Sequence, residues 1–399
     1  MFENFKMVSH TRQEGSQDLT FLSRERAEQV RRFHATFPAY TETPLVSFPK
    51  LAQELGLNEL YVKDESKRFG LNAFKVLGGS YAIGCEVAKR LGVSKEEMNY
   101  RLLAAPETRE KTGQLTFVTA TDGNHGRGVA WTAHVLGHRS VVYMPTGSAQ
   151  ERLRNIRAEG AEAAITEFNY DDAVRLANRK AEEKGWIIVQ DTAWPGYEDI
   201  PTHIMQGYAT MALEADEQLT QPPTHIFLQA GVGSMAGAVL GYFAAVYGAD
   251  RPIVTIVEPN KADCVFRTAQ AGDGKLHYVT GTMDTIMAGL ACGEPNPIAW
   301  NILQDYADHF ISCPDWVAAQ GMRILGDPVR DTERVVSGES GAVTAGLVKE
   351  LMTRPELAQL KEQIGLDKTS RVLCFSTEGD TDQANYRRIV WDGAYAAPY

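Results

Sequence analysis

Short apolar runs alternate with amphipathic segments along most of this chain of 399 residues. Runs rich in β-branched and aromatic residues are typical of buried strands, and apolar positions three or four residues apart are typical of helices. The runs that predict strands cover residues 60–63, 115–121, 140–145, 163–166, 186–190, 224–229, 253–257 and 371–376. The segments that predict helices cover residues 23–34, 74–91, 125–136, 148–158, 171–184 and a stretch that starts at Met235. Because strands that alternate with helices of this length form parallel sheets with right-handed crossovers, the pattern predicts an α/β fold with two sheets.

Two details sharpen this prediction. Ser148 is of a residue type that caps helices, so we expect it to begin the helix that follows. Three glycines within residues 74–91 predict a helix that packs tightly against another element. The two series of strands predict a larger domain, made of residues 1–85 and 206–399, and a smaller βαβ domain of residues 86–205.

Composition and charge exclude several classes of protein. Forty Lys and Arg residues stand against 51 Asp and Glu residues, for a formal net charge of −11, and the basic residues form no run. An acidic chain of this kind predicts no nucleic-acid partner and no anionic membrane partner. No apolar stretch approaches the roughly 20 residues of a membrane-spanning helix.

The five cysteines are scattered and form no Cys-x-x-Cys motif. This spacing predicts reduced thiols in a cytoplasmic protein, with neither a disulfide framework nor a metal site. The sequence leaves open whether Cys264 and Cys292 approach each other.

Lys75 stands where a polar loop gives way to a predicted helix. An amine at a helix start lies beside the positive end of the helix dipole, which together with burial lowers its pKa. A neutral amine is the nucleophile that forms a Schiff base. The alternative is one more solvated lysine, because most lysines are exposed. The apolar neighbours Phe74, Val76 and Leu77 argue against full solvation.

Two glycine-bearing turns follow predicted strands. In the first, Asp122 and Asn124 lie among small residues, so a carboxylate and an amide could meet a ligand close to the backbone. The second runs from Gly231 to Gly237, where backbone N–H groups at a helix start suit a phosphate. It has neither the lysine of a P-loop nor the spacing of the dinucleotide fingerprint. The first turn could instead be a strand-to-helix turn with Asp or Asn as a helix cap, and glycine-rich turns like the second also occur without a ligand.

Two further strand ends carry polar side chains. Ser376 and Thr377 lie at the end of the last predicted strand, where a hydroxyl could meet a ring nitrogen, and Asp191 follows the strand that ends at residue 190. The alternatives are a polar turn and a helix cap. Because open α/β sheets bind ligands at the carboxyl ends of their strands, the placement of these groups predicts a ligand site there.

A helix-start lysine, an asparagine loop, a glycine-rich phosphate turn and a terminal hydroxyl, in this order, resemble the fold type II pyridoxal phosphate enzymes. This is the tryptophan synthase β-like family, which includes the serine and threonine dehydratases, and the resemblance spans about residues 40–390. Within it, four segments resemble the diaminopropionate ammonia-lyases, namely residues 63–75, 121–131, 287–297 and 376–381. Plain dehydratases usually have a small uncharged residue where this chain has Asp122. This difference is the strongest indication of the substrate.

The resemblance implies a role for each matching residue. Lys75 would bind pyridoxal 5′-phosphate covalently, and Asn124 would hydrogen-bond the ring 3-oxygen. Ser376 would face the ring nitrogen, with Thr377 as the less favoured choice; a neutral hydroxyl there favours elimination over racemisation or transamination. The residues that would wrap the phosphate are Gly231, Val232, Gly233, Ser234 and Met235. Val232 replaces a glycine of many relatives, which we expect to be harmless because only backbone N–H groups are needed.

The activity that the resemblance implies is α,β-elimination of 2,3-diaminopropionate, in its D and L forms, to pyruvate and two molecules of ammonia. Lys75 and Asp122 would remove the Cα proton from opposite faces, and Asp122 and Asp191 would keep the departing β-amine protonated. The alternatives are serine or threonine dehydration or a β-replacement on the same fold. More distant is a non-catalytic phosphate-binding protein that uses Gly231–Gly237 alone. By analogy with fold type II relatives, we also expect a homodimer.

Overall fold

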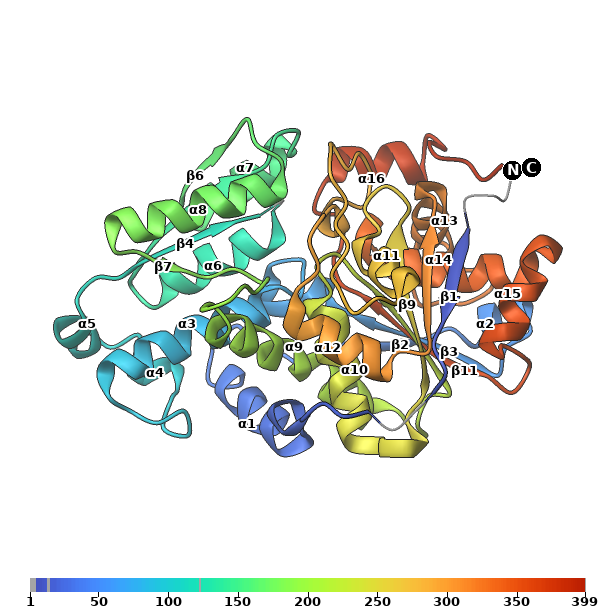
Figure 1. Ribbon diagram of the computed structural model, residues 1–399, viewed down its shortest axis with the longest axis horizontal. Coiled ribbons are helices and arrows are strands. Elements are labelled where there is room, and N and C mark those ends of the chain that lie inside the picture. The colour runs from blue at the N-terminus through green and yellow to red at the C-terminus, as the bar shows by residue number, and fades with distance from the viewer. Residues whose placement is uncertain (1–4, 13–14, 122, 399) are drawn as a thin grey trace.

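The computed structural model describes residues 5–12, 15–121 and 123–398, and within them two β-sheets (Figure 1). The larger sheet has the strand order β1-β10-β9-β8-β11-β3-β2, and the smaller sheet has the order β6-β5-β4-β7. The strands are β1 (Lys6–Ser9), β2 (Leu45–Ser47), β3 (Glu59–Asp64), β4 (Thr116–Ala120), β5 (Arg139–Met144), β6 (Glu162–Ile165), β7 (Ile187–Ile188), β8 (His225–Gln229), β9 (Ile253–Pro259), β10 (His309–Cys313) and β11 (Arg371–Ser376).

Helices cover both sheets. The α-helices are α1 (Arg24–His34), α2 (Pro49–Leu55), α3 (Val76–Leu91), α4 (Tyr100–Leu103), α5 (Pro106–Thr112), α6 (Asn124–Val135), α7 (Gln150–Ala158), α8 (Tyr170–Lys184), α9 (Asp199–Gln218), α10 (Ser234–Tyr247), α11 (Cys264–Ala271), α12 (Pro297–Tyr306), α13 (Asp315–Gly326), α14 (Glu339–Thr353), α15 (Ala358–Ile364) and α16 (Gln383–Val390). The short 3₁₀ helices are η1 (Thr20–Leu22), η2 (Glu65–Gly70), η3 (Gly248–Asp250), η4 (Ala288–Leu290) and η5 (Pro355–Leu357). None of the helices among the described residues is long and apolar enough to cross a bilayer.

Nearly all strand pairs are parallel. Strands β10, β9, β8, β11 and β3 run parallel, and among the described strands of this sheet only the edge strands β1 and β2 are antiparallel to their neighbours. All pairs of the smaller sheet are parallel. The predicted α/β fold with two mainly parallel sheets is therefore confirmed.

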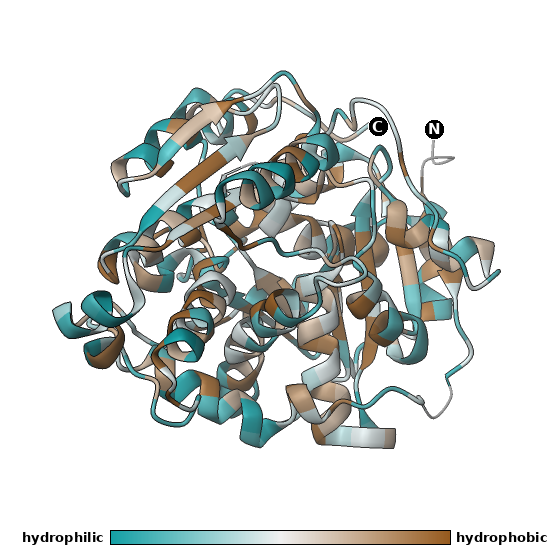
Figure 2. Cartoon of the chain, turned by 60° about the vertical axis from the view of Figure 1, so that its left-hand side comes forward, coloured by the Kyte–Doolittle hydropathy of each residue, from teal (hydrophilic) through white to brown (hydrophobic). Residues whose placement is uncertain are grey.

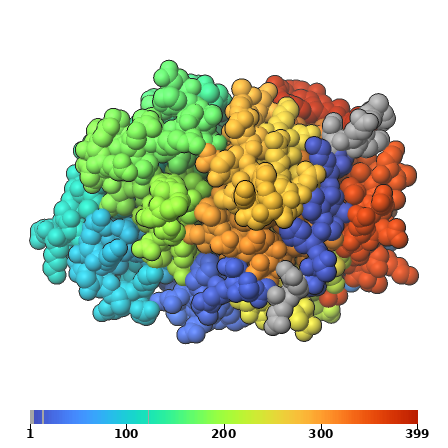
Figure 3. Space-filling view, viewed as in Figure 1, coloured from blue at the N-terminus to red at the C-terminus, as the bar shows by residue number. Residues whose placement is uncertain are grey.

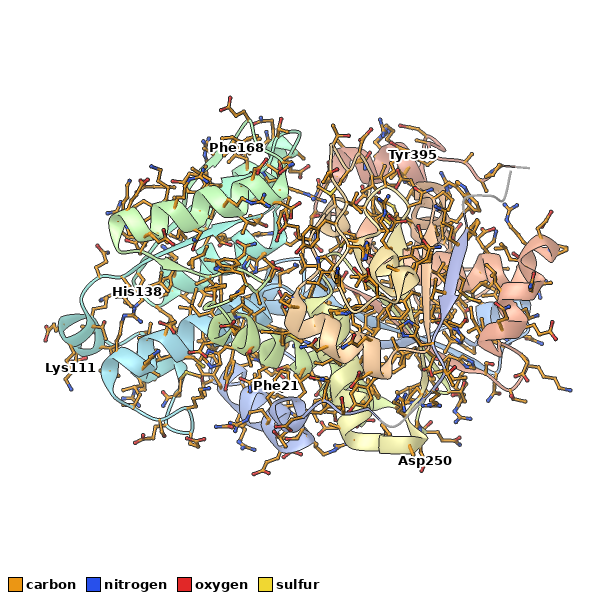
Figure 4. The ribbon with its side chains drawn as sticks, viewed as in Figure 1. Phe21, Lys111, His138, Phe168, Asp250 and Tyr395 are labelled. Atoms are coloured by element: carbon orange, nitrogen blue, oxygen red, sulfur yellow. The ribbon has the colours of Figure 1, made fainter. Side chains whose placement is uncertain are left out.

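The larger sheet buries both of its faces. Along β8, Ile226 and Leu228 pack into one apolar cluster with α9, α10 and α12, whereas Phe227 packs into the other with α13 and α14. This alternation follows from the period of two along a strand. Brown apolar strands under helices with teal outer surfaces show the same layering in Figure 2, and Figure 4 shows side chains filling the space between the layers.

Most of the predicted elements are confirmed, and their boundaries differ by a few residues. One cap was wrong: α7 begins at Gln150 after Ala149, and the Ser148 hydroxyl instead donates to the carbonyl of Pro145 at 2.8 Å. The edge strand β1 was missed because its pairing with β10, which lies 300 residues along the chain, is not visible in a four-residue mixed segment.

The predicted division into two domains stays a prediction. The smaller sheet lies entirely within residues 86–205, as that division requires. The two boundaries, at residues 85 and 205, fall inside α3 and α9, which pack against each other. In Figure 1 these helices pass between the part at the left that holds the smaller sheet and the part at the right that holds the larger sheet.

Helix α3 approaches its neighbours at positions that leave no space for a side chain. A Cβ atom at Gly78 would lie 2.6 Å from side-chain atoms of Ile204 and Tyr208 of α9. A Cβ atom at Gly128 of α6 would lie 2.8 Å from Cα of Val76. The prediction that the glycines allow a tightly packed helix is therefore confirmed.

A fully buried charged cluster anchors the segment that leads to α3. Arg68 Nη2 lies 2.8 Å from Glu65 Oε1 and 2.6 Å from Glu214 Oε2, and Lys63 Nζ lies 2.8 Å from the same Glu214 oxygen. Burial by itself would raise the pKa of Glu214, but the positive charges of Arg68 and Lys63 outweigh it and lower that pKa. The cluster joins β3 and η2 to α9, next to the start of α3.

We expect the Glu214→Gln variant to lose about 3–5 kcal/mol of unfolding free energy, because it leaves Lys63 and Arg68 buried with less compensating charge. Urea unfolding followed by circular dichroism measures this loss. The matched control is Glu217→Gln on the same helix, whose side chain is 35% exposed and pairs with Arg31. That variant should lose no more than about 1 kcal/mol. Equal losses in the two variants would contradict the anchoring role of the cluster.

Candidate active site

One cavity collects side chains from both sheets. It lies where the carboxyl ends of β8 and β11 of the larger sheet face β4 and β7 of the smaller sheet. Its lining residues are Phe74, Lys75, Ala120, Thr121, Asn124, His125, Tyr170, Asp191, Gln229, Ala230, Gly231, Val232, Gly233, Ser234, Met235, Ala288, Gly289, Leu290, Cys292, Ser340, Thr377 and Glu378. Four of the strand-end features predicted to form a ligand site therefore meet here, as expected for parallel sheets: Asn124, Asp191, the turn that starts at Gly231, and Thr377.

Lys75 is the residue immediately before the first turn of α3, as predicted. Its amine forms an ion pair with the carboxylate of Asp191, which follows β7 on the smaller sheet. Burial by itself would raise the pKa of Asp191, but the charges of Lys75 and His125 hold it well below its usual range. The second carboxylate oxygen of Asp191 accepts a hydrogen bond from the Tyr170 hydroxyl at 3.2 Å. Lys75 is thus paired with a buried carboxylate from the smaller-sheet part, a contact that the sequence did not predict.

Asn124 is the first residue of α6, and its side chain crosses the cavity to the larger sheet. Its amide nitrogen donates to Glu378 Oε2 at 2.5 Å. Glu378 is buried, and its other oxygen accepts from the backbone N–H of Ser340 at 3.1 Å, at the start of α14. No role was expected for Glu378 from the sequence, although the residue lies in one of the four segments that carried the resemblance. Asp122 lies outside the described residues.

The turn between β8 and α10 has the geometry of an anion site. Gly233 has φ of +97°, in the left-handed region that favours glycine, and the 14-residue helix α10 starts at Ser234. A Cβ atom at Gly231 would lie 3.2 Å from the carbonyl oxygen of Gly289, so the absence of a side chain keeps this turn open. Backbone N–H groups at such a helix start suit a phosphate.

The side chains of this turn serve its structure. The Ser234 hydroxyl donates to the backbone carbonyl of Asp191 and accepts from Asn296 Nδ2 at 2.8 Å. Val232 is buried in an apolar cluster with Cys292. Valine at this position therefore fits without disturbing the backbone of the turn. Met235 also lines the cavity, in the first turn of α10.

Ser376 is the last residue of β11, and Thr377 is the first residue after it. Ser376 does not line the cavity; its hydroxyl is buried and donates to the Ser337 hydroxyl at 2.8 Å. Thr377 lines the cavity, and its Oγ1 accepts from Gln229 Nε2 at 2.9 Å. Consecutive side chains at a strand end point to opposite sides, so only one of the two can face the cavity. The structure brings Thr377 there and leaves Ser376 outside, which favours Thr377 as the group that meets the ring nitrogen; the choice between the two stays a prediction.

None of the five cysteines, all of which the structure describes, forms a disulfide bond. Cys264 and Cys292 both lie beside Gly231: the Cys264 sulfur is 3.6 Å from its carbonyl oxygen, and a Cβ atom at Gly231 would lie 3.1 Å from the Cys292 sulfur. The two thiols therefore flank the glycine-rich turn.

The residues that line the cavity fit pyridoxal phosphate. The glycine-rich turn offers backbone donors to a phosphate, the Lys75 amine offers a nucleophile, and Asn124 and Thr377 offer polar groups between them. Space-filling atoms of the smaller-sheet part, in green, meet those of the larger part, in yellow and orange, along the boundary in Figure 3.

Comparison with known proteins agrees with this arrangement. The chain matches the family described as "Pyridoxal-phosphate dependent enzyme" over residues 36–366. It is 52% identical over 383 residues to the diaminopropionate ammonia-lyase of Salmonella typhimurium, covering 95% of both chains. A crystal structure of diaminopropionate ammonia lyase from Escherichia coli in complex with D-serine aligns with a TM-score of 0.92 and 47% identity, covering 98% of both chains.

A second crystal structure of the Escherichia coli enzyme, in complex with an aminoacrylate-PLP azomethine reaction intermediate, aligns with a TM-score of 0.90 and 48% identity over 98% of both chains. Identity of this extent, over nearly the whole length of the relatives, establishes the family. The chain belongs to the diaminopropionate ammonia-lyases, within the pyridoxal-phosphate-dependent enzymes.

Proposed function

We propose that this protein catalyses α,β-elimination of 2,3-diaminopropionate, in its D and L forms. The β-amine leaves as ammonia, and hydrolysis of the released enamine by one water gives pyruvate and the second molecule of ammonia. The observation that carries the proposal is the convergence of Lys75, Asn124 and the glycine-rich turn on one cavity, in a chain 52% identical to a diaminopropionate ammonia-lyase. Serine or threonine dehydration is the second candidate, favoured by the D-serine in the crystal structure of the Escherichia coli relative.

The residues of the cavity suit the cofactor as follows. Lys75 would bind pyridoxal phosphate through its amine, and the backbone N–H groups from Gly231 to Met235 would bind the phosphate. Asn124 would donate to the ring 3-oxygen through the amide N–H that does not face Glu378. Thr377, which lines the cavity, replaces Ser376 as the residue that would face the ring nitrogen.

Bound pyridoxal phosphate supplies the electron sink that makes the Cα proton of an amino acid acidic. The protein then has to remove that proton and keep the β-amine protonated as it leaves. Lys75 would take the proton from one face, and we assign Asp122 to the other. Asp191 and Glu378 line the cavity as carboxylates, so a substrate with a second ammonium group would meet favourable charge there.

Steady-state assays with diaminopropionate, serine and threonine separate the two candidates. We expect kcat/KM for diaminopropionate to exceed that for either hydroxy amino acid, because only the diamino acid carries a cationic leaving group. A higher value for serine or threonine would make the protein a dehydratase of the same fold.

We also propose a cytoplasmic location, from the reduced cysteines, and a homodimer, from analogy with fold type II relatives. Sedimentation equilibrium of the holoenzyme tests the assembly. A molecular mass near 44 kDa instead of twice that value would contradict the dimer.

We expect the Lys75→Ala variant to lose the covalently bound chromophore, and its elimination rate to fall by at least about 10²-fold, the lower end of what a positioned acid–base group contributes. Borohydride reduction followed by peptide mapping should place the label on Lys75 of the unmodified enzyme. Lys67→Ala is the matched control, because Lys67 is exposed in the same segment. Recovery of the label on another lysine would overturn the assignment of Lys75.

We expect the Asp122→Asn variant to lose well over tenfold in rate on D-diaminopropionate and much less on the L form, since general base catalysis contributes ~10²–10⁴. The two enantiomers are assayed separately for kcat. Small and equal losses on both enantiomers would remove Asp122 from the role of base.

A further inference from the structure

Gln229 ends β8, directly beside β11 in the sheet, and it lines the cavity. Its side chain is buried, at 1% exposure. The amide nitrogen lies 2.9 Å from the backbone carbonyl oxygen of Phe375 and 2.9 Å from Oγ1 of Thr377. The amide oxygen has no hydrogen-bond partner among the described residues. No step of the proposed reaction requires this residue.

The carbonyl of Phe375 determines which way round the Gln229 amide lies. A carbonyl oxygen only accepts, so the amide group within hydrogen-bond distance of it must be the NH₂ group. That group has two hydrogens, and the second one points to Thr377. Gln229 is therefore a donor to Oγ1 of Thr377, and the opposite arrangement would place two acceptors against each other.

This arrangement leaves the hydroxyl hydrogen of Thr377 for another acceptor. A hydroxyl has one hydrogen and two lone pairs, and one lone pair is used by Gln229. The described residues offer Thr377 Oγ1 no hydrogen-bond partner besides Gln229. Because Thr377 lines the cavity, its O–H is available to an acceptor inside the cavity.

We propose that Gln229 is a positioning residue that makes Thr377 a hydrogen-bond donor and so keeps the ring nitrogen of the cofactor unprotonated. This inference rests on the proposed function, which places the ring nitrogen at Thr377. An unprotonated ring withdraws less electron density from Cα, which favours loss of the β-amine over racemisation and transamination. Gln229 thereby contributes to reaction specificity without contacting the substrate.

Gln229→Glu is the decisive variant, since glutamate has the same shape but offers Thr377 an acceptor where glutamine offers a donor. An ionised glutamate only accepts, and a protonated one whose single hydrogen is used by Phe375 accepts from Thr377 as well. The Thr377 hydrogen would then turn to residue 229, and Oγ1 would present a lone pair to the ring nitrogen. The measurement is ¹⁵N NMR of the holoenzyme reconstituted with cofactor labelled at that nitrogen.

We expect the protonated fraction of the ring nitrogen to rise at least about tenfold in Gln229→Glu, the factor that corresponds to 1.4 kcal/mol. The ratio of racemisation to elimination should rise with it. Gln229→Met, which removes the donor without adding an acceptor, should give a smaller change at the nitrogen but a larger loss of stability. A merely structural role predicts the larger change at the ring nitrogen in Gln229→Met, because methionine is the poorer match to the buried polar site.

The control is Gln206→Glu. Gln206 is also buried, its amide nitrogen donates to the carbonyl of Phe21 at 3.1 Å, and its amide oxygen also has no partner among the described residues. It does not line the cavity, so the ring nitrogen should be unchanged in this variant.

Thr377→Val separates failure of this inference from failure of the cofactor placement. If Thr377→Val moves the ¹⁵N signal and Gln229→Glu does not, Thr377 faces the ring nitrogen but Gln229 does not set its polarity, and the inference is wrong. If neither variant moves the signal, the ring nitrogen lies elsewhere and the inference is overturned together with that placement. If the Gln229→Glu variant does not fold, an unchanged signal in both Gln229→Met and Thr377→Val also overturns it.

Discussion

The site depends on the close approach of α3 to two other helices. Gly78 lets α3 lie against α9, and Gly128 lets the backbone of α6 reach Val76, the residue next to Lys75. A side chain at either position would push the helices apart, because the space is already occupied. This contact places an amine from the start of α3 between the strand ends of two separate sheets.

Charge compensation within the cavity follows from that placement. Lys75 meets Asp191 of the smaller-sheet part, and Asn124 of the same part meets Glu378 from beyond β11. Lys75 and Glu378 follow strands of the larger sheet, and Asn124 and Asp191 follow strands of the smaller sheet. Both contacts therefore connect the two sides of the cavity. A buried carboxylate needs such partners, because an isolated charge in the interior is costly. The same carboxylates give the cavity an acidic lining that suits a diamino acid.

The pattern of neighbouring residues predicted the elements whose bounds depend on short-range interactions. The strand β11 was predicted with its observed bounds, and α1 and α3 within two residues, because a period of two or 3.6 is legible within a dozen residues. The expected cap at Ser148 was wrong, since its hydroxyl had a competing acceptor in the carbonyl of Pro145. Strand β1 was missed because its register comes from β10 alone. Glu378 went unassigned because a carboxylate in a polar turn is ordinary until its burial against Asn124 is known.

The sequence by itself determined the class of fold, the family, the lysine at a helix start and the glycine-rich turn, since each is carried by consecutive residues. Only the tertiary structure decided which of two adjacent hydroxyls, those of Ser376 and Thr377, reaches the cavity, because that choice depends on the side of β11 from which each projects. It also decided the direction of the hydrogen bond between Gln229 and Thr377. That direction is set by the carbonyl of Phe375 on β11, the strand beside β8. Which strands lie side by side depends on how the whole sheet packs.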